Sequence, residues 1–149
     1  MRIVLDTNIL IRAAADEQGL AGRVLQEIAS GPHILVCSPY LLTEASRVLA
    51  YPRLQARWLL GDEEIREFVS RVAAIAEIVH TTTPELVVAG DPDDDPIVQT
   101  AVLGGAGVLC TRDAHLFDAD VVSYCAGHGV RVMNDIELYH SLVGRPKDA

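Results

Sequence analysis

Residues 2–8 read Arg2-Ile3-Val4-Leu5-Asp6-Thr7-Asn8, an apolar run that ends in an aspartate directly before a helical pattern. The same form returns at residues 108–113, as Val108-Leu109-Cys110-Thr111-Arg112-Asp113. Both runs are continuously apolar, which is typical of strands in a parallel sheet that helices cover on both faces. In each run a carboxylate follows the end of the strand. The two stretches therefore predict acidic side chains at the carboxyl ends of parallel strands, where such sheets place their sites.

Short apolar runs alternate with helical patterns along the rest of the chain. We expect strands at Arg2–Asp6, His33–Cys37, Glu77–His80, Gly107–Cys110 and Gly129–Met133. We expect helices at Thr7–Ala15, Gly22–Ser30, Pro39–Ala50, Arg53–Leu60, Asp62–Ile78, Pro96–Leu103, Ala119–Ala126 and Asp135–Val143. This alternation predicts an α/β fold, a three-layer sandwich around a mostly parallel central sheet. A length of 149 residues fits one domain over residues 1–143, followed by a tail at 144–149.

Composition indicates a globular protein of a reducing compartment. No apolar run approaches the ~18 residues that a membrane span needs. The first residues already form a strand, without the long apolar stretch of a secretory signal. The three cysteines are widely spaced and form no CxxC pattern, which favours small buried apolar residues over disulfides or zinc ligands. We therefore expect a soluble cytoplasmic protein that does not associate with membranes.

The net charge of −9 at pH 7 has the wrong sign for simple electrostatic binding of nucleic acid. Either the partner is not nucleic acid, or the negative charge is concentrated where bound cations neutralise it. All but one of the basic residues are arginines, and five lie in one central stretch: Arg47, Arg53, Arg57, Arg66 and Arg71. These five either form a face that contacts phosphates or are solvated charges on helices.

Glu44 lies at the margin of the apolar stripe of an expected helix. Ser38-Pro39 reads as the N-cap and first residue of this helix. At helical spacing Glu44 is beside Leu41 and Val48 rather than opposite them. A bare buried carboxylate is costly, so Glu44 must be paired with a cation, bound to a metal or extended to solvent.

The densest acidic segment is Asp91-Pro92-Asp93-Asp94-Asp95-Pro96, which leads into an apolar helix. Pro96 suits the first helical position, which makes Asp95 the expected N-cap. The remaining aspartates then repel one another, and no lysine or arginine lies within the segment. A bound divalent ion would relieve this repulsion. An EF-hand is excluded, because its glycine and distant glutamate are missing.

Carboxylates without a set of histidines or cysteines favour Mg²⁺ or Mn²⁺ over zinc. We expect Asp6, Asp94 and Asp113 to be the ligands, with Glu44 binding the metal or orienting a water. Asn8, Thr111 and Asp95 are candidates for orienting these acids through hydrogen bonds. Such a centre polarises a phosphodiester, activates an attacking water and stabilises the leaving oxygen, with one ion or two.

The ordered set of these motifs resembles the PIN-domain family, and most closely its small bacterial branch, the VapC-like toxins. The resemblance runs through nearly the whole chain, to the strand at Val130–Met133 and the helix after it. It implies a metal-dependent endoribonuclease that uses Mg²⁺ or Mn²⁺, forms a homodimer and is restrained by a cognate antitoxin. The family's acids fall on Asp6, Glu44, Asp94 and Asp113. Asp94 is preferred over Asp95 because that acid stands three residues before the first apolar residue of its helix.

Other functions remain as alternatives. The chain could be a PIN-like module that binds a partner and no longer cleaves, although acids stand at all four positions. An α/β phosphatase with Asp6 as nucleophile is disfavoured, because Asn8 replaces the second aspartate of an Asp-x-Asp motif. The sole lysine, Lys147, also lies near the chain end. A P-loop or dinucleotide site is excluded, because the glycines at 104–107 follow a helix instead of a strand.

Overall fold

The computed structural model describes residues 1–81 and 95–144 and contains a central sheet of five strands in the order β3-β2-β1-β4-β5. The strands are β1 (Arg2–Leu5), β2 (Ile34–Cys37), β3 (Glu77–Ile78), β4 (Val108–Cys110) and β5 (Arg131–Met133). Every pair of neighbouring strands is parallel. The predicted α/β fold with a parallel central sheet is therefore confirmed.

Helices connect the strands and cover the sheet. They are α1 (Thr7–Ala15), α2 (Leu20–Ser30), α3 (Pro39–Leu49), α4 (Pro52–Trp58), α5 (Asp62–Ile75), α6 (Asp95–Leu103), the 3₁₀ helix η2 (Ala114–Phe117), α7 (Ala119–Gly127) and α8 (Asp135–Val143). Ser38 caps α3 as predicted, since its Oγ accepts a hydrogen bond from the Leu41 amide at 3.4 Å. None of the helices within the described residues is both long and apolar enough to cross a membrane.

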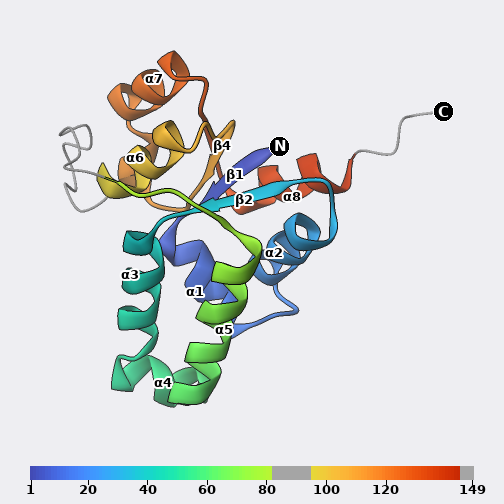
Figure 1. Cartoon of the computed structure of the whole chain (residues 1–149), viewed down its shortest axis with the longest axis vertical. Coiled ribbons are helices and arrows are strands. Elements are labelled where there is room, and N and C mark those ends of the chain that lie inside the picture. Colours follow the sequence, from blue (N-terminus) through green and yellow to red (C-terminus); the bar gives the residue numbers. More distant parts are fainter. Residues whose placement is uncertain (82–94, 145–149) are drawn as a thin grey trace.

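The sheet is the middle layer of three. Along β1, Ile3 and Leu5 contribute to a core shared with α1, α2, α5 and α8, whereas Val4 contributes to a second core with α6 and α7. Figure 1 shows these two groups of helices on either side of the strands. Burial on both faces explains why the strands are continuously apolar. All three cysteines are buried and free, as the sequence predicts.

The largest differences from the predicted boundaries occur around β3. The helix expected at Asp62–Ile78 ends at Ile75, and Ala76 is extended. Glu77 then pairs with Val36 of β2 and binds the Arg2 guanidinium at 2.8 and 2.9 Å. Residues 77–78 fit a helical stripe and a short strand equally well, and these distant partners select the strand.

Other boundaries shift by a few residues, and one short helix was not predicted. Helix α2 begins at Leu20 instead of Gly22, and α6 begins at Asp95 instead of Pro96. The unpredicted element is η2, which directly follows Asp113. Several residues used in the sequence analysis lie outside the described residues: Asp91, Asp93, Asp94 and the tail after Gly144, including Lys147.

Candidate functional site

Asp6 is the buried acid at the end of the central strand. Its backbone amide donates to the Cys110 carbonyl at 2.9 Å, which extends the pairing of β1 and β4 by one residue. The side chain is only 2% exposed and does not cap α1, although Asp6 occupies the N-cap position. Helix capping, the structural explanation for an aspartate here, therefore does not account for its carboxylate.

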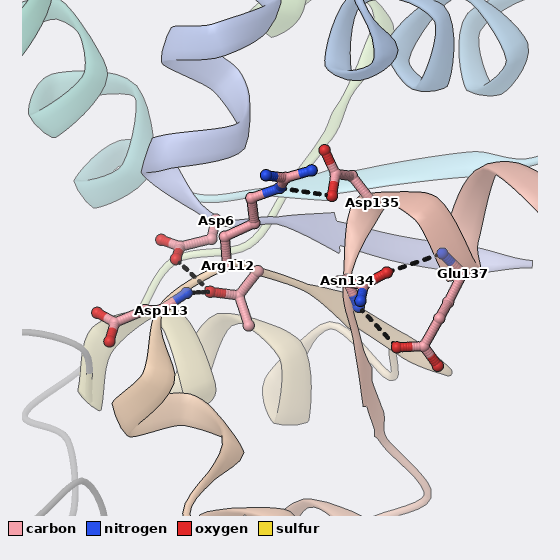
Figure 2. A network of polar contacts seen from close by, with 7 residues as sticks. Asp6, Arg112, Asp113, Asn134, Asp135 and Glu137 are labelled. Carbon is pink, nitrogen blue, oxygen red and sulfur yellow. Dashed lines mark hydrogen bonds and ion pairs between the residues drawn. The ribbon is translucent and has the colours of Figure 1, made fainter.

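Thr111 links Asp6 to Asp113. The buried Thr111 hydroxyl donates to Asp6 Oδ2 at 2.7 Å and accepts the Asp113 amide at 2.9 Å. Asp113 in turn caps η2, because its Oδ1 accepts the His115 amide at 2.9 Å. Figure 2 shows Asp6 and Asp113 in this network, with the hydrogen bonds drawn as dashed lines. Residues 105 positions apart in the chain thus share one hydrogen-bonded site at the edge of the sheet.

The electrostatics of this site favour a cation. The pKa of Asp6 is raised to about 6, mainly by burial and to a smaller extent by the nearby charge of Asp113. Hydrogen bonds from Thr111 and from the Thr7 backbone lower the pKa but do not offset burial. A carboxylate with these surroundings is poorly stabilised when it is ionised. A bound cation would supply the compensating positive charge.

Glu44 is neutralised within its own helix. Its side chain is 27% exposed and forms an ion pair with Arg47, whose Nε donates to Glu44 Oε2 at 3.3 Å. A second nitrogen of the same guanidinium contacts Glu44 Oε1. Arg47 also contacts the Tyr51 hydroxyl. The sequence left Glu44 to be paired with a cation, bound to a metal or extended to solvent, and in the structure it is paired with the Arg47 guanidinium.

Comparison with protein families gives this arrangement a context. A family model described as PIN domain matches residues 2–115. The chain belongs to the PIN domain family. Among curated proteins, it is similar to "Uncharacterized protein MJ1680" of Methanocaldococcus jannaschii, with 25% identity over 116 residues that cover 78% of this chain and 73% of that protein. No solved structure matches the chain.

PIN domains are generally metal-dependent nucleases that use divalent ions. Within residues 1–81 and 95–144 of this PIN domain, no three histidine, cysteine or acidic side chains form a group that could hold a metal. Asp94 lies outside those residues. Asp6 and Asp113 nevertheless fit a magnesium-type site, because Mg²⁺ is commonly held by one or two carboxylates and completes its shell with water and substrate phosphate.

The remaining predicted residues have different surroundings. Asn8 is exposed at the start of α1 and has no hydrogen bond to a carboxylate among the described residues. Asp95 is the first residue of α6. The matched span of the PIN domain includes Asp6, Glu44, Asp94 and Asp113.

A second buried acid, not predicted from the sequence, lies at the same edge of the PIN domain. Asp135 is 2% exposed, and its Oδ1 accepts the Arg112 Nε at 2.7 Å. The ion pair raises the pKa of Arg112. Figure 2 shows Arg112 extending from the segment between Thr111 and Asp113 toward Asp135. The available signal was position, since Asp135 stands two residues after the end of β5 and Asp6 directly follows β1.

A cleft of about 700 Å³ adjoins the carboxylate site of this PIN domain. Asn8, Arg112 and Asp135 line one part of it, and residues of α1, α2, α3 and α4 and of the α1–α2 connection line the rest. Two of its lining residues are neighbours of the acids in the chain: Arg112 directly precedes Asp113, and Asn8 comes two residues after Asp6.

Proposed function

We propose that this PIN domain is an endoribonuclease that hydrolyses RNA phosphodiesters with Mg²⁺ or Mn²⁺ held by Asp6, Asp94 and Asp113. The observation that carries the proposal is the state of Asp6. This carboxylate is buried at the end of the central strand, its pKa is raised to about 6, and a second carboxylate lies nearby. Burying an acid in this way is unfavourable unless a cation binds it.

In this proposal each residue of the site has a distinct task. The bound ion would polarise the phosphodiester and make a water molecule nucleophilic at neutral pH. Thr111 fixes the orientation of Asp6 through its 2.7 Å hydrogen bond and also holds the Asp113 backbone. Glu44 would orient the attacking water, for which it would have to exchange part of its pairing with Arg47. Asn8 and Asp95 would support these groups by hydrogen bonding.

We further propose a cellular setting on the resemblance to VapC-like toxins. In that setting the protein is cytoplasmic and homodimeric and is the toxin of a toxin–antitoxin pair. A cognate antitoxin holds it inactive. The motif order and the match to the PIN domain family support this setting, whereas MJ1680 adds no functional information.

The decisive experiment is Mn²⁺ titration calorimetry combined with cleavage of a mixed single-stranded RNA. Wild type, Asp6→Asn and Asp94→Asn are compared with Glu67→Gln, which changes an exposed acid on α5. We expect wild type and Glu67→Gln to bind Mn²⁺ and cleave, and both aspartate variants to lose at least about a hundredfold in cleavage rate.

Two results would redirect the proposal. Wild-type protein that binds Mn²⁺ but leaves RNA intact would favour a catalytically silent module that binds a partner. Absence of Mn²⁺ binding to wild type at millimolar concentration would contradict a metal-dependent mechanism.

A further inference from the structure

Two buried hydroxyl groups from distant parts of the chain meet between α3 and α6. Ser38, the N-cap of α3, and Thr100 of α6 are both fully buried, and their hydroxyl oxygens lie 2.9 Å apart. Thr100 Oγ1 also lies 2.7 Å from the Pro96 carbonyl oxygen, in the first turn of its own helix. Ser38 Oγ accepts the Leu41 amide at 3.4 Å. The first turns of the two helices are thus joined by side chains that stand 62 positions apart in the chain.

The direction of these hydrogen bonds follows from the number of protons. A hydroxyl carries one proton, a backbone amide only donates and a carbonyl only accepts. Thr100 therefore donates its proton to the Pro96 carbonyl, and the Ser38 hydroxyl donates to Thr100 Oγ1. Only this arrangement makes a hydrogen bond of all three contacts, because a Thr100 proton given to Ser38 would leave the Pro96 contact without one. The three bonds run in one direction from Leu41 to Pro96, and we call this set of four residues the hydroxyl bridge.

Local hydrogen bonding does not require the two side chains to meet. A threonine within a helix can bond to the carbonyl four residues earlier, and a serine N-cap needs only an amide of its own helix. The bond between Ser38 and Thr100 is therefore additional to what each helix needs. Apolar contacts have no preferred direction, whereas a hydrogen bond has a narrow range of lengths and angles. The bridge thus adds a defined geometry to the apolar core in which Leu41 of α3 and Ile97 of α6 take part.

Each end of the hydroxyl bridge lies close in sequence to an acid of the proposed site. Leu41 is three residues before Glu44, about one turn away on α3. Pro96 is two residues after Asp94, which lies outside the described residues. Groups that act at a reacting centre have to be held within about 0.5 Å of their working geometry. The relative placement of α3 and α6 therefore matters to both acids.

We infer that Ser38 and Thr100 are positioning residues of the proposed nuclease. They hold the first turn of α6 to the first turn of α3, and so fix the helix that follows Asp94 relative to the helix that carries Glu44. Both hydroxyls act through the backbone of these helices and not by contact with metal or RNA. This inference rests on the proposed function, and it adds two residues that no acidic motif marks.

Thr100→Val tests the hydroxyl bridge, because valine keeps the shape of the side chain and has no hydroxyl. We expect kcat for RNA cleavage in Mn²⁺ to fall at least about tenfold, since a displaced catalytic group slows the chemical step. KM for RNA should stay within about twofold of wild type, because Thr100 does not contact the substrate. Thr100→Ser returns the hydroxyl and is expected to recover most of kcat. Ile28→Val is the matched control, because it removes one methylene group from the other core and tests reduced stability alone.

Ser38→Ala and the double variant Ser38→Ala/Thr100→Val show whether the two hydroxyls act through one bond. Each single variant already breaks the bridge, so the double variant should lose about as much kcat as the more affected single variant. Wild type and the three variants are also compared by urea denaturation in EDTA. There the double variant should lower the equilibrium constant of folding by less than the product of the two single decreases.

Thermal melting establishes that each variant is folded at the assay temperature, and Thr100→Ala replaces Thr100→Val if the latter is not. A wild-type kcat in Thr100→Val would overturn the inference. So would an equal loss in Thr100→Ser, because the shape of the side chain and not its hydroxyl would then decide the rate. Losses that multiply in the double variant would show that the two hydroxyls act separately, which also contradicts the bridge. If wild type itself neither binds Mn²⁺ nor cleaves RNA, the proposed function fails, whereas the denaturation series needs no metal and still decides whether the bridge joins the two helices.

Discussion

Asp6 combines a buried carboxylate with surroundings that oppose its ionisation. Its pKa is about 6 in the folded protein, against roughly 3.9 for an unperturbed aspartate. Between these values the folded protein binds more protons than the unfolded chain. The free energy of unfolding therefore falls as pH rises from about 4 through 6. A shift of this size corresponds to about 3 kcal/mol lost at pH 7.

Asp6→Asn is expected to remove this loss, because an asparagine keeps an acceptor for the Thr111 hydroxyl and carries no charge. In EDTA, we expect the variant to gain about 2–3 kcal/mol over wild type between pH 4 and pH 7. Urea denaturation at several pH values measures this difference. Glu67→Gln should follow the wild-type pH dependence. Parallel curves for wild type and Asp6→Asn would contradict the raised pKa.

The charge of the buried Asp135 carboxylate is compensated by the Arg112 guanidinium. Removing the guanidinium in Arg112→Ala leaves a carboxylate that is 2% exposed without its ion pair. Because Arg112 itself is 40% exposed, we expect a moderate loss of about 2 kcal/mol in the free energy of unfolding. Arg131→Ala is the control, since its pair with Glu137 is 4.0 Å long and exposed, and should change stability by less than about 0.5 kcal/mol.

The surroundings of some of these acids could be predicted from the sequence, and those of others could not. Asp6 and Asp113 follow apolar strands, so the rule for parallel sheets predicts that they share an edge. The pairing of Arg112 with Asp135 bridges 23 positions and has no local pattern. Glu44 was recognised as needing a partner, but helical spacing alone does not choose between Arg47, three residues on, and a metal.

At the scale of elements, the start of α2 depends on a close approach that the sequence pattern does not reveal. A Cβ at Gly22 would lie 2.3 Å from the Glu17 carbonyl oxygen and 2.6 Å from its carbon. Helix propensity favours alanine over glycine by about 1 kcal/mol. The backbone clash is larger, so we expect Gly22→Ala to destabilise the protein by about 2 kcal/mol or more.

Gly127, the last residue of α7, provides the matched comparison because a Cβ there has no neighbour within 4 Å. We expect Gly127→Ala to be neutral or to stabilise the protein by up to about 1 kcal/mol. Chemical denaturation of both variants gives the two values. Equal effects would show that helix propensity, and not the contact with Glu17, decides the outcome at Gly22.

Most elements of the fold were predictable, because periodicity and capping residues act locally. Helices α1 and α8 have the predicted bounds, and Ser38 caps α3. The main exception is a boundary that depends on partners far along the chain. The strand expected at Glu77–His80 is present as β3, Glu77–Ile78, but the helix expected to reach Ile78 ends at Ile75. Pairing with β2 and the bond between Arg2 and Glu77 fix this boundary, and the sequence around residues 75–80 does not contain that information.

For the whole molecule, the order of the strands is what creates the site. Because β1 and β4 are parallel neighbours, their carboxyl ends meet, and Asp6 and Asp113, which follow these strands, come together. The sequence indicates that the strands are parallel, but the order of strands in the sheet is set by packing of the two cores. The cleft beside α4 has the same origin, since Arg12, Trp58 and Arg112 are far apart in the chain.

A metal bound between β1 and β4 would therefore stabilise the entire domain and not only one loop. At a Mn²⁺ concentration a hundred times the Kd, binding adds about 2.7 kcal/mol. For a domain of this size we expect a rise in Tm of about 5–10 °C over protein in EDTA. The rise should be smaller at pH 5, because protons compete with the metal for Asp6, whose pKa is about 6. Differential scanning calorimetry at pH 5 and pH 7.5 measures both effects.

Glu67→Gln should keep the full rise in Tm on Mn²⁺ binding, and Asp6→Asn should lose most of it. A full rise in Asp6→Asn would mean that Mn²⁺ binds elsewhere, and that the edge between β1 and β4 is not the metal centre.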